Sequence, residues 1–390
     1  MAAVVTWLFA RSHSTAAVSA FLIARIVAAT AGSVLAAPLL DRLPGFRTLS
    51  IIELARGAIT LCALPLALAG FVVPVVVAVC ISTLTGAATS PSAASLVPEL
   101  LPRELVNLGN GLHGLTQNVV MVVGAAAGSF AVIRLGIGGA LALDITTFCI
   151  AAVLYLRFAA QPQANPTASE GASHRELLRN LVSSRLVLGV TASFTVVTAA
   201  MGLLNATLPA FFDGKLAATD VYGYALAAIG AGAMVGELLT GFVDAESAAR
   251  RSVTLAFLLS AASVLVLSRT GTLATAYLML LLLGMSDGTT ETVRDTLFQR
   301  YLPRRLRAGT FALSSAFQNA GMVVGFALAP VVLSFASSAR AFDIVALGCV
   351  AGAALAAVAL LRRPTTVGTV TTSLSVLDRA ATAPETASSG

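Results

Sequence analysis

Four ionisable side chains lie close together inside one apolar stretch in the second half of the chain: Asp287, Glu291, Arg294 and Asp295. Asp287 and Glu291 are four residues apart, so a helix places both carboxylates on one face. A charge in the middle of a membrane-spanning helix costs about 2.5–3.5 kcal/mol unless it is paired or faces water. Because desolvation favours the neutral form of a carboxylate, Asp287 is the first candidate for a site that binds and releases a proton.

Two further carboxylates are candidates for the same role. Glu237 lies deep in another apolar stretch, where it needs a partner. Glu291 is close to Arg294 and Asp295 on a helix, and mutual pairing near the membrane surface is the favoured interpretation of these three residues. For Asp287, a structural role is as compatible with the sequence as a role in proton coupling.

Polar side chains within the apolar stretches are candidates for binding a solute, because a polar stripe on an apolar helix is expected to face water. Arg25 would attract an anionic or polar solute from such a position, whereas Arg56 is expected to pair with Glu53 or Asp41. The candidates for the wall of an aqueous cavity are Arg25, Thr289, Thr290, Gln117 and Gln318.

Several kinds of chemistry leave no trace in the sequence. The four cysteines all lie in apolar stretches without a CxxC motif, and the three histidines are scattered, so neither disulfides nor a metal site is expected. No glycine-rich loop precedes a Lys-Ser or Lys-Thr pair, so ATP is not the expected energy source. No nucleophile–base arrangement is visible either. These patterns argue against an enzyme and against any cofactor.

The composition predicts an integral membrane protein. Charged residues make up 11% of the chain and hydrophobic residues 57%, whereas about 25% of a soluble domain is charged. The formal net charge of +6 would suit nucleic acid, but the basic residues are not clustered with aromatic ones. They lie between the apolar stretches, where orientation in a lipid bilayer explains them.

The apolar stretches are long enough for membrane-spanning helices, which need about 20 residues. They are continuous and do not alternate between apolar and polar residues, which favours helices over barrel strands. Eleven spans are predicted, at residues 16–40, 49–69, 71–96, 112–133, 137–156, 186–211, 222–243, 253–267, 273–298, 310–335 and 342–361.

One sequence phrase occurs twice. A Gln-Asn pair followed three residues later by Met-Val-Val-Gly spans residues 117–124 and again 318–325, an offset of 318 − 117 = 201. A period this long is not that of a solenoid. It indicates a duplication of half the molecule, as in secondary transporters built from repeats. The same offset aligns residues 1–10 only with the end of the span at 186–211. We therefore expect a first helix that begins before Met1, shortened by a mis-set start or by a deletion.

The basic residues predict the topology. Alternate loops hold sixteen arginines on one side of the membrane against five basic residues on the other. By the positive-inside rule the first side, with the C-terminus, is cytoplasmic. Both halves then have the same orientation, related by an axis along the membrane normal. The expected units are a bundle at 1–158, a cytoplasmic linker at 159–184, which includes a short surface helix at 174–181, a second bundle at 185–363 and a disordered tail at 364–390.

The chain resembles the major facilitator superfamily over nearly its whole length. Beside the parallel duplication, the connection at residues 37–47, Ala-Pro-Leu-Leu-Asp-Arg-Leu-Pro-Gly-Phe-Arg, is similar to the signature loop of that superfamily. The segment Gly-Ala-Ala-Ala-Gly at 124–128 is similar to an element of drug/proton antiporters. Within the superfamily, the chain is most similar to the branch of macrolide-efflux and enterobactin-exporter-like proteins. The similarity lies in the sequence pattern of residues 91–98 and in Leu143-Asp144 before Phe148.

This resemblance implies roles for further residues. Asp41, Arg42 and Arg47 would form a gating loop that favours one of two facing states through contacts with a helix end. The sequence departs from the family pattern at Ala37, Phe46 and Ala125, and its fourth span carries no arginine. The spacing of Gly124 and Gly128, repeated by Gly321 and Gly325, allows close helix packing without any specific role in antiport.

Together these features predict a monomeric, all-α major facilitator fold in the cytoplasmic (inner) membrane. The predicted function is proton-coupled export of small organic molecules such as drugs, natural products or siderophores. The only partners expected are this solute, protons and the lipid bilayer. One alternative is a lipid or lysophospholipid flippase of the same fold. Another is a non-transporting membrane remnant or sensor, which the short first helix makes conceivable.

Overall fold

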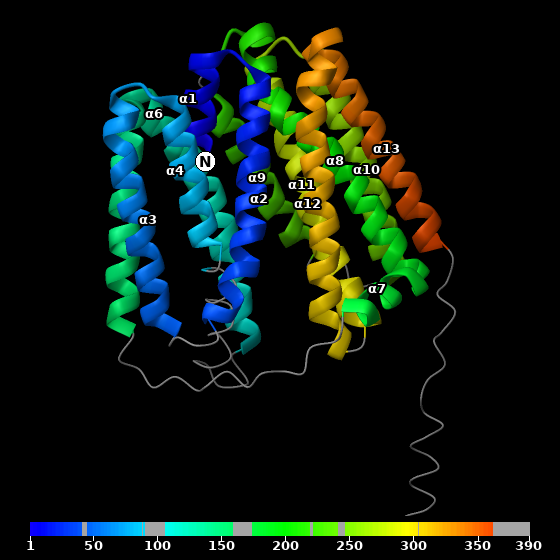
Figure 1. Cartoon of the computed structure of the whole chain (residues 1–390). Helices are drawn as coiled ribbons and strands as arrows, with labels where there is room; N and C mark the ends of the chain where they lie inside the picture. The colour runs from blue at the N-terminus through cyan, green and yellow to red at the C-terminus, as the bar shows by residue number, and fades with distance from the viewer. Residues whose placement is uncertain are drawn as a thin grey trace, which may run out of the picture.

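The computed structural model describes residues 1–40, 45–87, 89, 106–158, 174–218, 221–240, 246–302 and 304–361. These residues form α-helices joined by short turns, without any strand in the ranges described. Nine of the described helices are long and apolar enough to cross a membrane, judged by length and composition. Figure 1 shows them standing side by side as a bundle.

The helices follow the predicted spans. The first half contains α1 (Ala2–Ser12), α2 (Thr15–Leu40), α3 (Gly45–Leu68), α4 (Val72–Gly86) and α6 (Val106–Phe158). The short helix α7 (His174–Ser183), predicted in the linker, leads into the second half. That half contains α8 (Arg185–Leu216), α9 (Tyr222–Thr240), α10 (Glu246–Arg269), α11 (Leu273–Tyr301), α12 (Arg304–Phe335) and α13 (Ser338–Leu361).

Two elements differ from the expected spans. The helix α6 contains both the span predicted at 112–133 and that at 137–156, with a kink at Gly136. There φ is 69°, a left-handed conformation that glycine adopts without steric cost. The helix α4 ends at Gly86, earlier than the predicted end at residue 96, and most of the chain beyond it lies outside the described residues. The helix α1 has 11 residues, whereas α8, its counterpart in the repeat, has 32.

Helix packing repeats in the two halves. In the first half α3 packs on α6, α2 on α4 and α3 on α4, while in the second half α10 packs on α13, α9 on α11 and α10 on α11. The halves meet along two seams, α2 on α12 and α6 on α9. The sequence offset relates α2 to α9 and the first part of α6 to α12. The contact of α2 with α12 therefore corresponds to the contact of α9 with α6, and the two seams are equivalent by the repeat. This equivalence is what a pseudo-twofold axis between like-oriented halves requires, and it confirms the predicted two-bundle, all-α fold.

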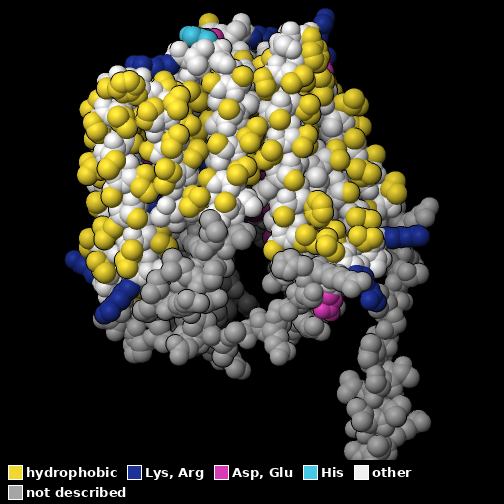
Figure 2. Space-filling view, in the orientation of Figure 1, with side chains coloured by type: hydrophobic (Ala, Val, Ile, Leu, Met, Phe, Trp, Pro, Cys, Tyr) yellow, Lys and Arg dark blue, Asp and Glu magenta, His cyan; other side chains and the backbone are white. Residues whose placement is uncertain are grey.

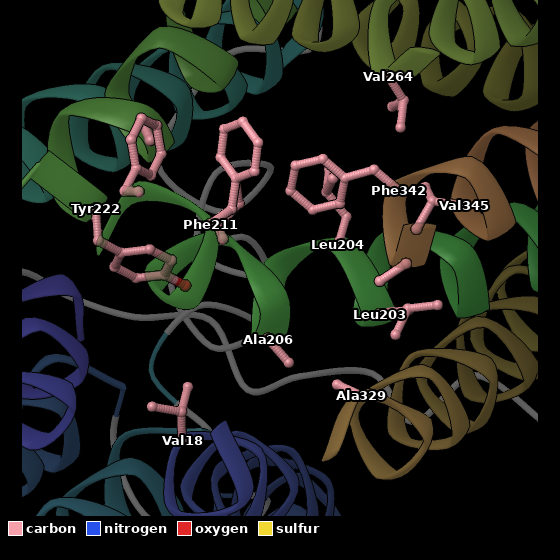
Figure 3. Close-up of a cluster of buried hydrophobic side chains, with 14 of the residues drawn as sticks. Val18, Leu203, Leu204, Ala206, Phe211, Tyr222, Val264, Ala329, Phe342 and Val345 are labelled. Carbon is pink, nitrogen blue, oxygen red and sulfur yellow. The ribbon is translucent and has the colours of Figure 1, made fainter. Parts of the chain in front are cut away.

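The two ends of the molecule are packed differently. We call the end at which α6 finishes and α7 begins the linker end, and the opposite end the distal end. At the distal end one apolar cluster joins the halves, with Val18, Phe21 and Leu22 of α2 against Phe211 of α8 and Tyr222 of α9 (Figure 3). We call this cluster the distal seal. At the linker end the buried clusters of the described residues belong to one half each.

The surface shows the same asymmetry. In Figure 2 hydrophobic side chains cover the flanks of the bundle, as lipid contact requires, and the molecule is hollowed between the halves toward the linker end. Leu68, Val73, Leu238 and Phe335 are among the large apolar side chains exposed on these helices. The described structure is thus closed at the distal end and open at the linker end.

Candidate functional site

Both halves place a charge directly beneath the distal seal. On α2, Val18, Phe21 and Leu22 are at most 1% exposed, and Arg25 is the next residue on the same face, three positions after Leu22. On α11, Leu280 and Leu283 are at most 3% exposed, and Asp287 follows Leu283 by four positions. Because residues three or four apart share a helix face, each charge lies one turn further toward the linker end than the seal.

Asp287 is exposed, although it lies at the midpoint of α11. Its carboxylate is in electrostatic range of Arg294 on the same helix and of Glu237 on α9. Such exposure in the middle of a helix that is packed between α9 and α10 indicates that the carboxylate faces the hollow between the halves rather than the interior of one bundle.

A seam of glycines brings Glu237 and Asp287 together. Gly236, next to Glu237, lies against the carbonyl oxygen of Met285, and Gly288, next to Asp287, lies against that of Ala233. A Cβ atom at either glycine would overlap these backbone atoms. Gly232 and Gly284 continue the seam one turn away. The sequence interpretation missed this seam, although the small-x-x-x-small spacing on both helices is its signal.

Arg294 is the centre of a saturated network toward the linker end. Its guanidinium group donates to both Glu291 carboxylate oxygens at 2.7 Å, to Asp295 Oδ1 at 2.8 and 3.0 Å, and to Gln318 Oε1 at 3.1 Å. It also lies over the ring of Phe194, with 5.2 Å from Cζ to the centroid. The side chain of Arg294 is only 9% exposed. The structure therefore pairs Glu291, Arg294 and Asp295, as the favoured interpretation expected.

The remaining polar candidates have internal partners. Thr290 is 1% exposed and its hydroxyl donates to the carbonyl of Asp287 at 2.9 Å. The Thr289 hydroxyl donates to the Met285 carbonyl at 2.9 Å and lies 3.4 Å from that of Gly236. Gln318 is 8% exposed and joins Arg294 to Ser314. In this conformation Thr290 and Gln318 are therefore buried supports rather than parts of an open wall. The side chain of Gln117 lies outside the described residues.

The arginines of the first half behave differently from each other. Arg56 Nη1 lies 3.0 Å from each Glu53 carboxylate oxygen, and its guanidinium covers the ring of Phe148 at 4.3 Å, which confirms the expected pairing with Glu53. Arg25 is half-buried, and no carboxylate of the described residues lies within ion-pair distance of it. Its neighbours include Tyr222 and Cys80, which are within electrostatic range.

The glycines predicted to mediate packing divide into two pairs. Gly321 lies against the carbonyl of Thr195 and Gly325 against Ala199 and Gly202, so α12 packs closely on α8 as predicted. A Cβ at Gly128 would make ordinary contact with Ala3, at 3.7 Å or more, so this glycine permits no unusually close approach.

For Gly124, prediction and structure differ. A Cβ at Gly124 would meet no atom within 4 Å, because this face of α6 is open. Among the described residues Gly124 therefore makes no close helix contact in this conformation. Of the predicted gating loop, Asp41 and Arg42 lie outside the described residues, while Arg47 is exposed near the start of α3.

Comparisons with known proteins agree with this architecture. The family profile of the Major Facilitator Superfamily matches residues 1–243. An uncharacterized MFS-type transporter, y4rN, of Sinorhizobium fredii (strain NBRC 101917 / NGR234) is 27% identical over 255 residues, which are 63% of this chain and 62% of that relative.

Two solved structures share the fold. The crystal structure of a D-xylose–proton symporter superposes with a TM-score of 0.68 at 15% identity, over 91% of this chain and 93% of that one. A bacterial homolog of the human lysosomal transporter Spinster, in an inward-facing and unoccupied conformation, gives a TM-score of 0.63 at 12% identity, over 92% of each chain. With a family profile that matches more than half of its length, this multi-pass membrane protein belongs to the Major Facilitator Superfamily.

Proposed function

We propose that this chain is a secondary active transporter that exports small organic molecules in exchange for protons. The observation that carries the proposal is the position of Asp287, an exposed carboxylate at mid-helix, one turn beneath the distal seal and close to Glu237. A carboxylate in the path between two packed halves is a natural proton site, because the path cannot dehydrate around an ionised group without a large cost.

The positive-inside rule supports an orientation for this cycle. With the arginine-rich loops and the C-terminus in the cytoplasm of a cell bounded by an inner membrane, the open linker end faces inward. Solute enters the hollow from the cytoplasm, and the halves then rock so that the distal seal opens. A proton that reaches Asp287 from outside neutralises the carboxylate and allows the empty transporter to close again and return.

The other charged candidates take supporting roles in this proposal. Glu237 is held next to Asp287 by the glycine seam, so the proton can be shared between them or pass from one to the other. Glu291 is held by Arg294 through two bonds of 2.7 Å and is less available as a proton site. Arg47 would contribute to closing the linker end with the predicted gating loop.

The test uses the full chain in liposomes with an imposed pH gradient and a panel of drugs, siderophores and other natural products. An antiporter accumulates its solute in the acidic compartment, whereas a symporter accumulates it in the alkaline one. We expect accumulation on the acidic side that is lost in Asp287→Asn and retained in Asp144→Asn, a control that removes an exposed carboxylate from α6. Accumulation on the alkaline side, or flux that is unchanged in Asp287→Asn, would contradict the proposal.

A further inference from the structure

Arg25 is a positive charge without a counter-ion among the described residues. The sequence places three arginines inside membrane spans, and two of them have charged partners. Arg56 pairs with Glu53, although its buried Nε has no hydrogen-bond partner, and Arg294 is held by Glu291, Asp295 and Gln318. Arg25 is half-buried in α2 and makes neither an ion pair nor a hydrogen bond to the described part of the chain. An intramembrane charge in this state needs water or a ligand to offset its desolvation.

The position of Arg25 gives that ligand access. Val18, Phe21 and Leu22 of the same helix face lie in the distal seal between the halves. Arg25 continues this face toward the linker end, where the described structure is open between the halves. A solute entering from the linker end therefore meets Arg25 just before it reaches the seal.

A second polar group, within electrostatic range of Arg25, also lacks a partner. Tyr222, at the start of α9 in the other half, is 1% exposed, and its hydroxyl has no hydrogen-bond partner in the described structure. It interacts electrostatically with Arg25, and Figure 3 shows its hydroxyl pointing from α9 toward the side of the seal on which Val18 of α2 lies. A buried tyrosine hydroxyl normally finds a partner. In this conformation the Tyr222 hydroxyl is packed inside the distal seal, so a group of the solute reaches it only when the seal opens.

We propose that Arg25 and the Tyr222 hydroxyl form a subsite for a carboxylate group of the transported solute. A guanidinium group presents paired N–H donors that match the two oxygens of a carboxylate, and the tyrosine hydroxyl adds a third donor from the opposite half. The proposal rests on the proposed function and narrows its substrate class to organic anions and zwitterions. The negative group then binds on the α2 side, while Asp287 on α11 handles the proton.

The chain contains a reporter for this subsite. Cys80 on α4 is partly exposed and lies within electrostatic range of Arg25. In a background with Cys62→Ser, Cys149→Ser and Cys349→Ala, Cys80 can be converted to a mixed disulfide by two methanethiosulfonate reagents of similar size, one sulfonated and one carrying a quaternary ammonium group. In each reaction the Cys80 thiolate forms the S–S bond and methanesulfinate leaves. We compare the rates at which the anionic and the cationic reagent modify Cys80. The ratio of the first rate to the second should fall by about tenfold in Arg25→Gln, because this variant removes a unit positive charge near the Cys80 thiol.

Matched variants and ligands make this experiment decisive. Arg25→Lys should keep most of the rate ratio, and Arg134→Gln, which removes an arginine that lies over Phe130 at 5.8 Å, should leave it unchanged.

Protection of Cys80 by a ligand tests the same subsite. Salicylate should protect Cys80 in the wild type but not in Arg25→Gln, whereas salicylamide, which lacks the carboxylate, should protect in neither. Tyr222→Phe should weaken the protection by salicylate. An unchanged rate ratio in Arg25→Gln, or equal protection by salicylate and salicylamide, would overturn the subsite. Neither result depends on proton coupling, which the Asp287→Asn experiment tests separately.

Discussion

The N-terminal half packs α3 on α6 and α2 on α4, and the C-terminal half repeats both contacts with α10 on α13 and α9 on α11, yet their buried charges differ. The offset of 201 residues relates Asp287 to Gly86 (287 − 201) and Arg25 to Leu226 (25 + 201). The acidic cluster of α11 thus has no counterpart at Gly86, and the lone arginine of α2 has none on α9. Duplication has preserved the helix packing, while the ionisable groups have diverged between the halves.

This difference suggests a division of labour between the halves. The C-terminal half holds its one buried arginine rigidly with three acceptors and keeps Asp287 free to face the hollow. The N-terminal half pairs Arg56 and leaves Arg25 available. Substitutions that remove a satisfied charge should therefore affect folding, whereas those that remove an available charge should affect transport.

Arg294→Gln should have the largest effect on folding. Removal of the buried guanidinium takes charged hydrogen bonds from Glu291, Asp295 and Gln318 at once. Each such bond is worth about 1.5–3 kcal/mol before solvent screening of the 42% and 45% exposed carboxylates reduces it. The measurement is the yield of monodisperse protein and its apparent melting temperature in detergent. Wild-type yield and melting temperature in this variant would show that the network does not hold α11 and α12 together.

Gly288→Val should come next, because any Cβ at this position overlaps the backbone of α9 at Ala233. Overpacking of a well-filled interface typically costs about 1–3 kcal/mol. Gly124→Val is the matched control on α6, where a Cβ meets open space, and it should leave the apparent melting temperature unchanged. Equal losses in the two variants would mean that the seam is not the cause.

Arg56→Gln should destabilise the N-terminal half less than Arg294→Gln destabilises the C-terminal half. Arg56, 25% exposed, pairs only with Glu53 across one i,i+3 contact, and the Thr89 hydroxyl still donates to the 5% exposed Glu53 at 3.2 Å. The loss is therefore that of charged hydrogen bonds to one partner, about 1.5–3 kcal/mol. The same thermal assay measures both variants. A greater loss in Arg56→Gln than in Arg294→Gln would reverse the comparison.

His13→Asn should have the smallest effect. His13 Nδ1 lies 3.7 Å from Asp213 Oδ2 and joins the α1–α2 connection to α8 at the distal end, with side chains 64% and 39% exposed. Exposed pairs of this kind contribute about 0–1 kcal/mol. We expect unchanged folding and transport. A clear loss of transport alone would identify this contact as part of the distal gate.

Much of the fold was accessible from the sequence because membrane helices are long apolar runs and the repeat fixes their orientation. The pairing of Arg56 with Glu53 was also predictable, since both lie on one helix. The burial of Thr290 and the open environment of Gly124 were not, because both depend on which face of a helix meets its neighbour. The same holds for the proximity of Arg25 and Tyr222, which are far apart in the sequence and meet only when the halves pack.

The central claim is that neutralising Asp287 allows the distal seal to close while the linker end opens. Spin labels at Arg157 and Val182, both exposed at the linker end, and at Ala16 and Gly214, both exposed at the distal end, report the two distances in a cysteine-free full chain. We expect acidification to lengthen the first distance and shorten the second, and Asp287→Asn to show that change at every pH. Distances that do not respond to pH in the wild type, or that respond equally in Asp287→Asn, would contradict the account.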